Sequence, residues 1–216
     1  MAVSESSIHK YELLDPDVRL MLQVRDDDAA AFEELVIRYQ NRVIGVLTHL
    51  TRKREQAEDL AQEVFLRVFR ARKRYTPDAK FSTWLFTIAN NVALNAKRSL
   101  ARRREVNLRA DAHDDDGPRA LDQMALEASG LMPTRQLDKT ERAEMVRLAI
   151  EALPERQRVA LLLSKFENMS YVDIAETMEM TVQATKSLLS RARENLRAIL
   201  EPYMQEGERP TEAADS

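Results

Sequence analysis

The chain of 216 residues contains no cysteine, only four glycines and only seven prolines. Without cysteine it has no disulfide framework, no thiolate metal site and no cysteine nucleophile. The scarcity of glycine and proline argues against an all-β protein, which needs many turns. We therefore predict an all-α protein, and a reducing compartment is compatible with the composition.

A membrane span and a secretory signal are also missing from the sequence. The longest strongly apolar run covers 159–163, whereas a helix that crosses a bilayer needs about 20 apolar residues. The N-terminal residues include Glu5, Lys10 and Glu12 with no apolar core between them. We therefore expect a cytoplasmic protein with no membrane insertion.

The segment 75–104 combines aromatic residues, adjacent carboxamides and a local excess of basic charge. Between Lys97 and Arg104 there are five basic residues and no acidic one, although the net charge of the chain is -3. Unpaired bases offer faces for stacking and edges for hydrogen bonds, and their phosphates attract cations. This pattern indicates single-stranded nucleic acid. The alternative is a buried helix face, because large apolar residues within 81–88 recur at helical spacing.

The first part of the chain, residues 16–104, predicts an N-terminal helical block. One helix follows Asp26, Asp27 and Asp28, which we interpret as helix-capping residues rather than a metal cluster. A second helix spans 55–72 with its apolar residues, Phe69 included, directed inward. A loop over 75–80, broken by a proline, then leads into a third helix.

The middle segment, 105–141, differs in composition. It has nine acidic residues against four basic ones, and it holds two of the four glycines. No sustained apolar period crosses its central part, so we predict a solvated acidic linker. His113 lies beside three aspartates, but a single histidine in a flexible segment makes a poor metal site, and we expect no metal.

The last block, 142–203, is again predicted to be helical. Pro154 begins one helix, and Ser170 with Asp173 three positions later forms a capping-box-like start for a short helix that ends near residue 178. A turn over 179–181 precedes a longer helix to about residue 200, where Pro202 is expected to stop it.

The last predicted helix has a basic outer face, with four basic residues against one acidic residue over 182–200. A short capped helix, a brief turn and a second helix have the proportions of a helix-turn-helix. The alternative is an ordinary helical hairpin with a solvated face. In the helix-turn-helix interpretation, Lys186, Ser187, Ser190 and Arg191 are placed to reach base edges or phosphates. Arg193 and Arg197 are placed to position the protein on the DNA backbone.

Both blocks, in this order, resemble bacterial sigma factors of the extracytoplasmic-function (ECF) class within the sigma-70 family. The resemblance covers most of residues 16–203. It rests on the motifs at 58–65, 81–91, 153–158, 170–175 and 186–193.

This resemblance implies a promoter-specificity subunit that binds the beta and beta-prime subunits of core RNA polymerase. It recognises minus-thirty-five DNA and opens the minus-ten element. The implied polymerase contacts are Glu58, Asp59, Gln62 and Glu63. The implied minus-ten contacts are Tyr75, Pro77, Asp78, Ala79, Lys80, Phe81, Asn91, Asn95, Lys97 and Arg98. Those for minus-thirty-five DNA are Lys186, Ser187, Ser190, Arg191 and Arg193.

The resemblance also implies an anti-sigma partner, no cofactor and no catalytic residue, with Trp84 structural. It divides the chain into a tail (1–15), region 2 (16–104), the acidic linker (105–141), region 4 (142–203) and a second tail (204–216). The linker would thread the polymerase cleft, unless it is an inert tether.

Departures and alternatives remain. Glu179 stands where the family turn usually has glycine, so the backbone would be strained if it is left-handed there. Leu188 and Ser190 replace residues that are common in the family helix that contacts minus-thirty-five DNA. A DNA-binding regulator without a polymerase-docking role is the second hypothesis. An enzyme is supported only by scattered aspartates, because the sequence lacks phosphate-loop and nucleophile motifs.

Overall fold

A computed structural model describes residues 11, 14–110 and 139–205. Every regular element in these ranges is a helix and none is a strand, which confirms the predicted all-α class. None of these helices combines the length and the apolarity that crossing a bilayer requires. The N-terminal group consists of α2 (Pro16–Arg25), α3 (Ala29–Thr51), α4 (Arg54–Ala71), the 3₁₀-helix η1 (Arg72–Arg74) and α5 (Phe81–Ala110). The C-terminal group consists of α6 (Lys139–Ala152), α7 (Glu155–Lys165), α8 (Tyr171–Thr177) and α9 (Val182–Gln205).

Of the three aspartates predicted to cap α3, Asp28 is the one that caps it. The Asp28 carboxylate accepts the backbone N–H groups of Ala30 and Ala31 at 2.9 and 3.2 Å. These N–H groups have no partner inside the helix, so the carboxylate satisfies them and also meets the positive end of the helix dipole. The Asp27 carboxylate forms ion pairs with Arg72 and Lys73 of η1, which follows α4.

Helix α2 was not anticipated as a separate element. It buries Val18, Met21 and Val24 in the core, and Asp15 caps its N-terminus by accepting the N–H of Asp17 at 2.9 Å. The sequence signal was present, because Asp15 precedes Pro16 in the order typical of a helix start.

Helix α4 buries most of the residues predicted to face inward, but Phe69 is 40% exposed. Its ring packs against Phe32 with centroids 5.1 Å apart, and the Arg72 guanidinium lies 4.0 Å over it. Because Phe32 is itself only partly buried, the pair lies at the edge of the core. The inward assignment of Phe69 was therefore wrong.

Two helix ends differ from the predictions. Helix α5 continues to Ala110, past the predicted start of the linker, because the segment after Arg104 contains no glycine or proline before Gly117. Helix α9 contains Pro202 and continues to Gln205. Proline removes one helix hydrogen bond, but its fixed φ is itself helical, so the chain can run on briefly near a helix end.

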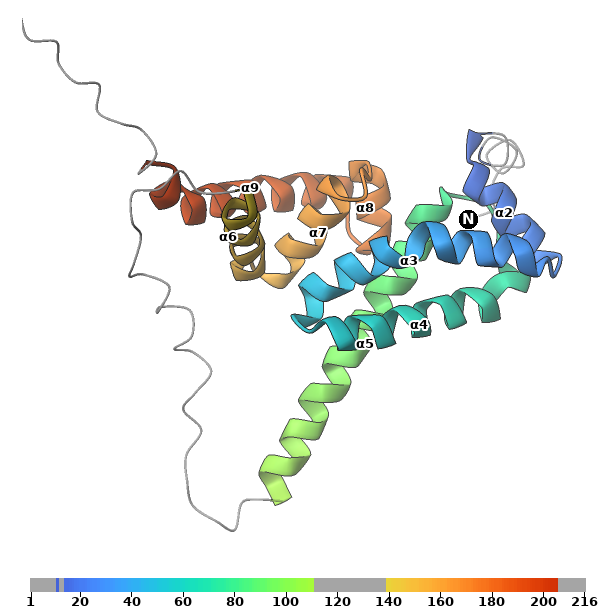
Figure 1. The fold of residues 1–216 in the computed structure, drawn as a ribbon, viewed down its shortest axis with the longest axis horizontal. Helices are drawn as coiled ribbons and strands as arrows, with labels where there is room; N and C mark the ends of the chain where they lie inside the picture. The colour runs from blue at the N-terminus through green and yellow to red at the C-terminus, as the bar shows by residue number, and fades with distance from the viewer. Residues whose placement is uncertain (1–10, 12–13, 111–138, 206–216) are drawn as a thin grey trace, which may run out of the picture.

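The two groups of helices pack against each other (Figure 1). Helix α8 lies against α5, and α7 lies against α3. One apolar core runs through both groups, since it contains Leu35 and Phe81 of the first and Val159 and Ile174 of the second. A smaller cluster, with Ile150, Leu153, Leu161 and Leu162, belongs to the C-terminal group alone.

Candidate nucleic-acid interface

Helices α8 and α9 form a capped helix-turn-helix. Ser170 accepts the N–H of Asp173 at 3.2 Å, and the Asp173 carboxylate accepts the N–H of Ser170 at 3.0 Å, which confirms the predicted capping box. Thr181 supports the start of α9 by accepting the N–H of Ala184 at 3.1 Å. Glu179 in the turn has φ 51°, so the backbone is left-handed where the sequence offers no glycine.

The outer face of α9 carries all five residues predicted for duplex DNA, and all five are exposed: Lys186, Ser187, Ser190, Arg191 and Arg193. On the opposite face, Thr185, Leu189 and Ala192 are buried and hold the helix against the rest of the C-terminal group. Within the described residues, the side chains of Lys186 and Arg191 make no hydrogen bond or ion pair. They are available to phosphates and base edges.

Tyr171 joins this basic face and was not assigned a role from the sequence. Its hydroxyl accepts a hydrogen bond from the Arg193 guanidinium at 3.1 Å. That bond and the nearby positive charges lower the pKa of Tyr171. The signal available in the sequence was a tyrosine directly after the predicted N-cap residue of the first helix.

The loop 75–80 presents fewer side chains than the sequence suggested. Tyr75, Pro77, Ala79 and Phe81 are buried, whereas Asp78 and Lys80 are exposed. The Tyr75 ring packs edge-on against Trp84 at 4.9 Å, and burial raises the pKa of its hydroxyl. In this conformation the loop offers a ligand mainly its backbone, the exposed Thr76 side chain and its two exposed charges.

Helix α5 carries the remaining residues predicted for the minus-ten element. Asn91, Asn95, Lys97 and Arg98 are all exposed on it. Trp84 and Ile88 are partly buried against the core, and Leu85 is fully buried. The alternative interpretation of this stretch as a core face is therefore correct for its apolar residues, while its polar residues face outward.

Carboxylates of the C-terminal group occupy two of these predicted DNA contacts. The Lys80 ammonium lies 3.3 Å from the Asp173 carboxylate, and Lys97 forms an ion pair with Glu155. Burial alone would raise the pKa of Asp173, but hydrogen bonds from Ser170 and the charge of Lys80 lower it. In this arrangement both lysines therefore face carboxylates of the C-terminal group.

A second set of contacts holds the two groups together near the end of α3. The Glu167 side chain is 3% exposed and lies 2.5 Å from the Arg42 guanidinium. Burial raises the pKa of Glu167, and Arg42 opposes that rise. Arg158 of α7 donates to the carbonyl of His49 at 3.0 Å and to those of Glu151 and Leu153 at 2.6 and 2.8 Å. It thus satisfies unpaired carbonyls at the ends of α3 and α6.

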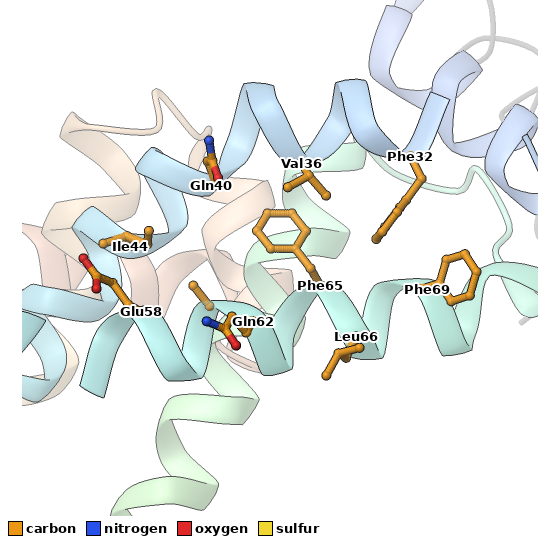
Figure 2. Close-up of a pocket in the computed structure, with 10 residues that line it drawn as sticks. Phe32, Val36, Gln40, Ile44, Glu58, Gln62, Phe65, Leu66 and Phe69 are labelled. Atoms are coloured by element: carbon orange, nitrogen blue, oxygen red, sulfur yellow. The ribbon is translucent and has the colours of Figure 1, made fainter. Parts of the chain in front are cut away.

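The face of α4 that resembles the polymerase-docking helix borders an apolar groove of about 750 Å³ between α3 and α4. Figure 2 shows Phe32 and Phe69 facing each other at one end of the groove and Glu58 at the other. Leu66, 49% exposed, was missed from the sequence, although a large apolar residue beside Gln62 was a usable signal.

Two of the four predicted docking residues already have partners on their own helix. Glu58 pairs with Arg54 at 2.8 Å, and Glu63 pairs with Arg67 at 2.7 Å. Asp59 and Gln62 are exposed, and their side chains make no hydrogen bond or ion pair in the described part of the chain. No group of three or more histidine, aspartate or glutamate side chains able to hold a metal occurs among the described residues, and His113 lies outside them.

Comparisons with protein families match both groups of helices. The family model described as Sigma-70 region 2 matches residues 35–103, and the model described as Sigma-70, region 4 matches residues 143–196. Two solved structures share the fold. CnrH in complex with the cytosolic domain of CnrY aligns with a TM-score of 0.60 at 20% identity, covering 87% of this chain and 99% of that one. RpoE in complex with the anti-sigma factor NepR from Bartonella quintana aligns with a TM-score of 0.56 at 22% identity, covering 79% and 96%.

Curated relatives extend the match to nearly the whole chain. The RNA polymerase sigma-H factor of Pseudomonas aeruginosa is 34% identical over 194 residues, which cover 89% of this chain and 97% of that protein. The ECF RNA polymerase sigma-E factor of Haemophilus influenzae is 34% identical over 190 residues, which cover 87% and 97%. This chain therefore belongs to the ECF sigma factors of the sigma-70 family, which are promoter-specific transcription initiation factors.

Proposed function

We propose that residues 16–104 dock on core RNA polymerase and capture the opened minus-ten strand, while residues 142–203 read minus-thirty-five DNA as a duplex. The observation that carries this proposal is the α9 face. Its residues Lys186 and Arg191 are exposed on the second helix of a capped helix-turn-helix and have no partner among the described residues. That is the geometry in which a helix enters the major groove.

The docking surface in this proposal is the outer face of α4. Asp59 and Gln62 supply polar contacts, Glu58 and Glu63 add negative charge, and the apolar groove with Leu66 at its edge supplies the area that a stable contact requires. The partner is the beta-prime subunit of core polymerase, and the C-terminal group meets the beta subunit.

For the minus-ten strand, the proposed binding surface is the loop 75–80 together with the exposed side of α5. Lys80, Lys97 and Arg98 attract the backbone, and the carboxamides of Asn91 and Asn95 bond to base edges. A flipped base loses a few kcal/mol of stacking, which the loop backbone and a carboxamide partly restore. Tyr75 and Phe81 act through packing, because their side chains are buried.

Strand capture in this proposal requires the two groups of helices to separate. Lys80 and Lys97 are paired with Asp173 and Glu155 in the closed arrangement, so their ammonium groups are already neutralised. Core polymerase would stabilise the open arrangement because it would bind that arrangement more tightly than the closed one. The acidic linker, mostly outside the described residues, would span the distance between the groups.

The chain acts in the cytoplasm in this proposal, catalyses no reaction of its own and needs no cofactor. An anti-sigma protein is the expected regulator, and it would cover the same polymerase- and DNA-facing surfaces. Support comes from the two solved structures with this fold, each of which is a complex, one with the cytosolic domain of CnrY and one with the anti-sigma factor NepR.

The test is promoter-dependent transcription by purified chain and core polymerase, with start sites mapped by sequencing the 5′ ends of transcripts. The double variant Asp59→Ala/Gln62→Ala should abolish it. The control Glu33→Ala/Asn41→Ala also removes one carboxylate and one amide from exposed positions and should leave it intact. Full initiation by the docking variant would refute the docking surface. Tight, specific duplex binding without core enzyme, and no transcription with it, would favour a polymerase-independent regulator.

A further inference from the structure

Helix α2 lies outside the residues matched by the region 2 model, which begin at 35, yet it contacts both ends of the segment 72–81. That segment contains the strand-capture loop 75–80. Contacts from one short helix to both ends of a loop determine where the loop lies, whatever the loop residues themselves do.

At its N-terminal end, α2 is joined to α5 through a single carboxylate. One oxygen of Asp15 accepts the N–H of Asp17 in α2 at 2.9 Å. The other oxygen accepts the N–H of Phe81, the first residue of α5, at 3.1 Å. Asp15 therefore caps two helices at once, and both N–H groups belong to the set that a helix cannot satisfy internally.

At its C-terminal end, α2 holds η1, the turn before the loop. The Lys73 ammonium donates to the carbonyl of Arg25 at 2.7 Å and to the Asp27 carboxylate at 2.5 Å. Asp27 also pairs with Arg72 at 3.0 Å. Its backbone has φ 70°, an uncommon value that places the carboxylate between the two cations.

We propose that Asp15 and Asp27 are positioning residues for strand capture, and that α2 fixes the loop 75–80 in the shape that receives the unpaired strand. This inference rests on the proposed role of the loop. The loop offers mainly backbone groups to a base, so its affinity for the base depends on the positions in which those groups are held. Without the Asp15 cap, the end of the loop next to Phe81 is no longer held in place. Part of the binding free energy of the DNA is then spent on ordering that end.

The experiment uses holoenzyme assembled from the full chain and core polymerase. Its probe is a fluorescent single-stranded oligonucleotide that carries the non-template minus-ten sequence of a promoter mapped by transcript 5′ ends. We expect Asp15→Ala to weaken oligonucleotide binding about tenfold, the effect of one lost hydrogen bond of ordinary net strength. Its affinity for core polymerase should not change.

The matched control is Asp28→Ala, which also removes an aspartate cap with two N–H bonds, in this case from α3. Asp28 makes no hydrogen bond to the described residues of 72–81. Both variants should lower the melting temperature, but only Asp15→Ala should weaken oligonucleotide binding. Equal oligonucleotide affinity for the two would overturn the inference, because Asp15 would then be a helix cap and nothing more.

Two further variants keep the outcomes separate. Asp15→Asn keeps one of the two acceptor oxygens, so it should fold even if Asp15→Ala does not. It should weaken oligonucleotide binding by a smaller factor than Asp15→Ala. Asn91→Ala tests the proposed strand contact itself. If Asn91→Ala weakens binding and the Asp15 variants do not, only the inference about α2 fails; if Asn91→Ala also has no effect, strand capture by this surface fails with it.

Discussion

The two surfaces proposed to meet DNA differ in how far they are exposed in the free chain. The α9 face presents five exposed residues on one helix, with its buried side fixed by Leu189 and Ala192. The minus-ten surface has four buried residues in or beside its loop, and two of its lysines are paired with carboxylates of the C-terminal group. In the proposed function, the duplex-binding surface is therefore already exposed in the free chain, whereas the strand-binding surface is partly covered until the C-terminal group moves away.

The largest expected effect comes from reversing the buried charge at the contact between the groups. Glu167→Lys places a second cation beside Arg42 at a site where the side chain is 3% exposed. Breaking a buried pair in this way costs about 3 kcal/mol, so the groups should separate while α8 and α9 stay folded. Small-angle scattering should show a larger radius of gyration.

The reciprocal change supplies the control for that variant. Arg42→Glu combined with Glu167→Lys restores opposite charges and should return the chain to its compact form. A compact Glu167→Lys variant would show that this ion pair does not hold the groups together.

The next effect concerns the exposed surface. Arg191→Ala should weaken binding of holoenzyme to minus-thirty-five duplex by about 1–3 kcal/mol if Arg191 reaches a base, and should mainly reduce the salt dependence if it reaches a phosphate. Fluorescence anisotropy at several salt concentrations separates these cases. Arg156→Ala, which removes an exposed arginine from α7, is the control.

A smaller effect is expected at the second lysine pair. Glu155→Gln removes the partner of Lys97 at the surface, where an ion pair contributes less than about 1 kcal/mol. The free chain should bind the minus-ten oligonucleotide slightly more tightly, and holoenzyme binding should not change. A weaker interaction in the free chain would mean that Glu155 assists the DNA surface rather than covering it.

The smallest effect is a pH dependence at His49, next to the contact between the groups. Burial lowers the pKa of His49 below its usual 6.5. The unfolded chain therefore binds the proton more tightly, and the stabilisation present above pH 6.5 is lost as the pH falls below it. Chemical denaturation at pH 5.5 and 7.5 should show a difference that His49→Gln reduces; an unchanged difference would assign it to other groups.

Local features of this fold could be predicted from the sequence. The caps at Asp28 and Ser170 depend on residues a few positions apart, and the structure has them as expected. The helix α4 and the exposed face of α9 follow from helical periodicity in the same way.

Contacts between distant segments could not be predicted in this way. Lys80 meets Asp173 and Arg42 meets Glu167 only because the two groups of helices pack together. The burial of Tyr75 likewise depends on packing against the Trp84 ring, so an aromatic residue in a predicted DNA loop became part of the core. Periodicity reports which face is apolar, but not which distant element covers it.

The most direct test of the covered minus-ten surface is a distance between the two groups in the free chain and in holoenzyme. The absence of native cysteine allows spin labels at Ser99→Cys and Arg156→Cys alone, both at exposed positions. Pulsed electron–electron double resonance should give one short, narrow distance for the free chain and a longer one with core polymerase. A long, broad distribution in the free chain, or the same short distance in both, would contradict the account.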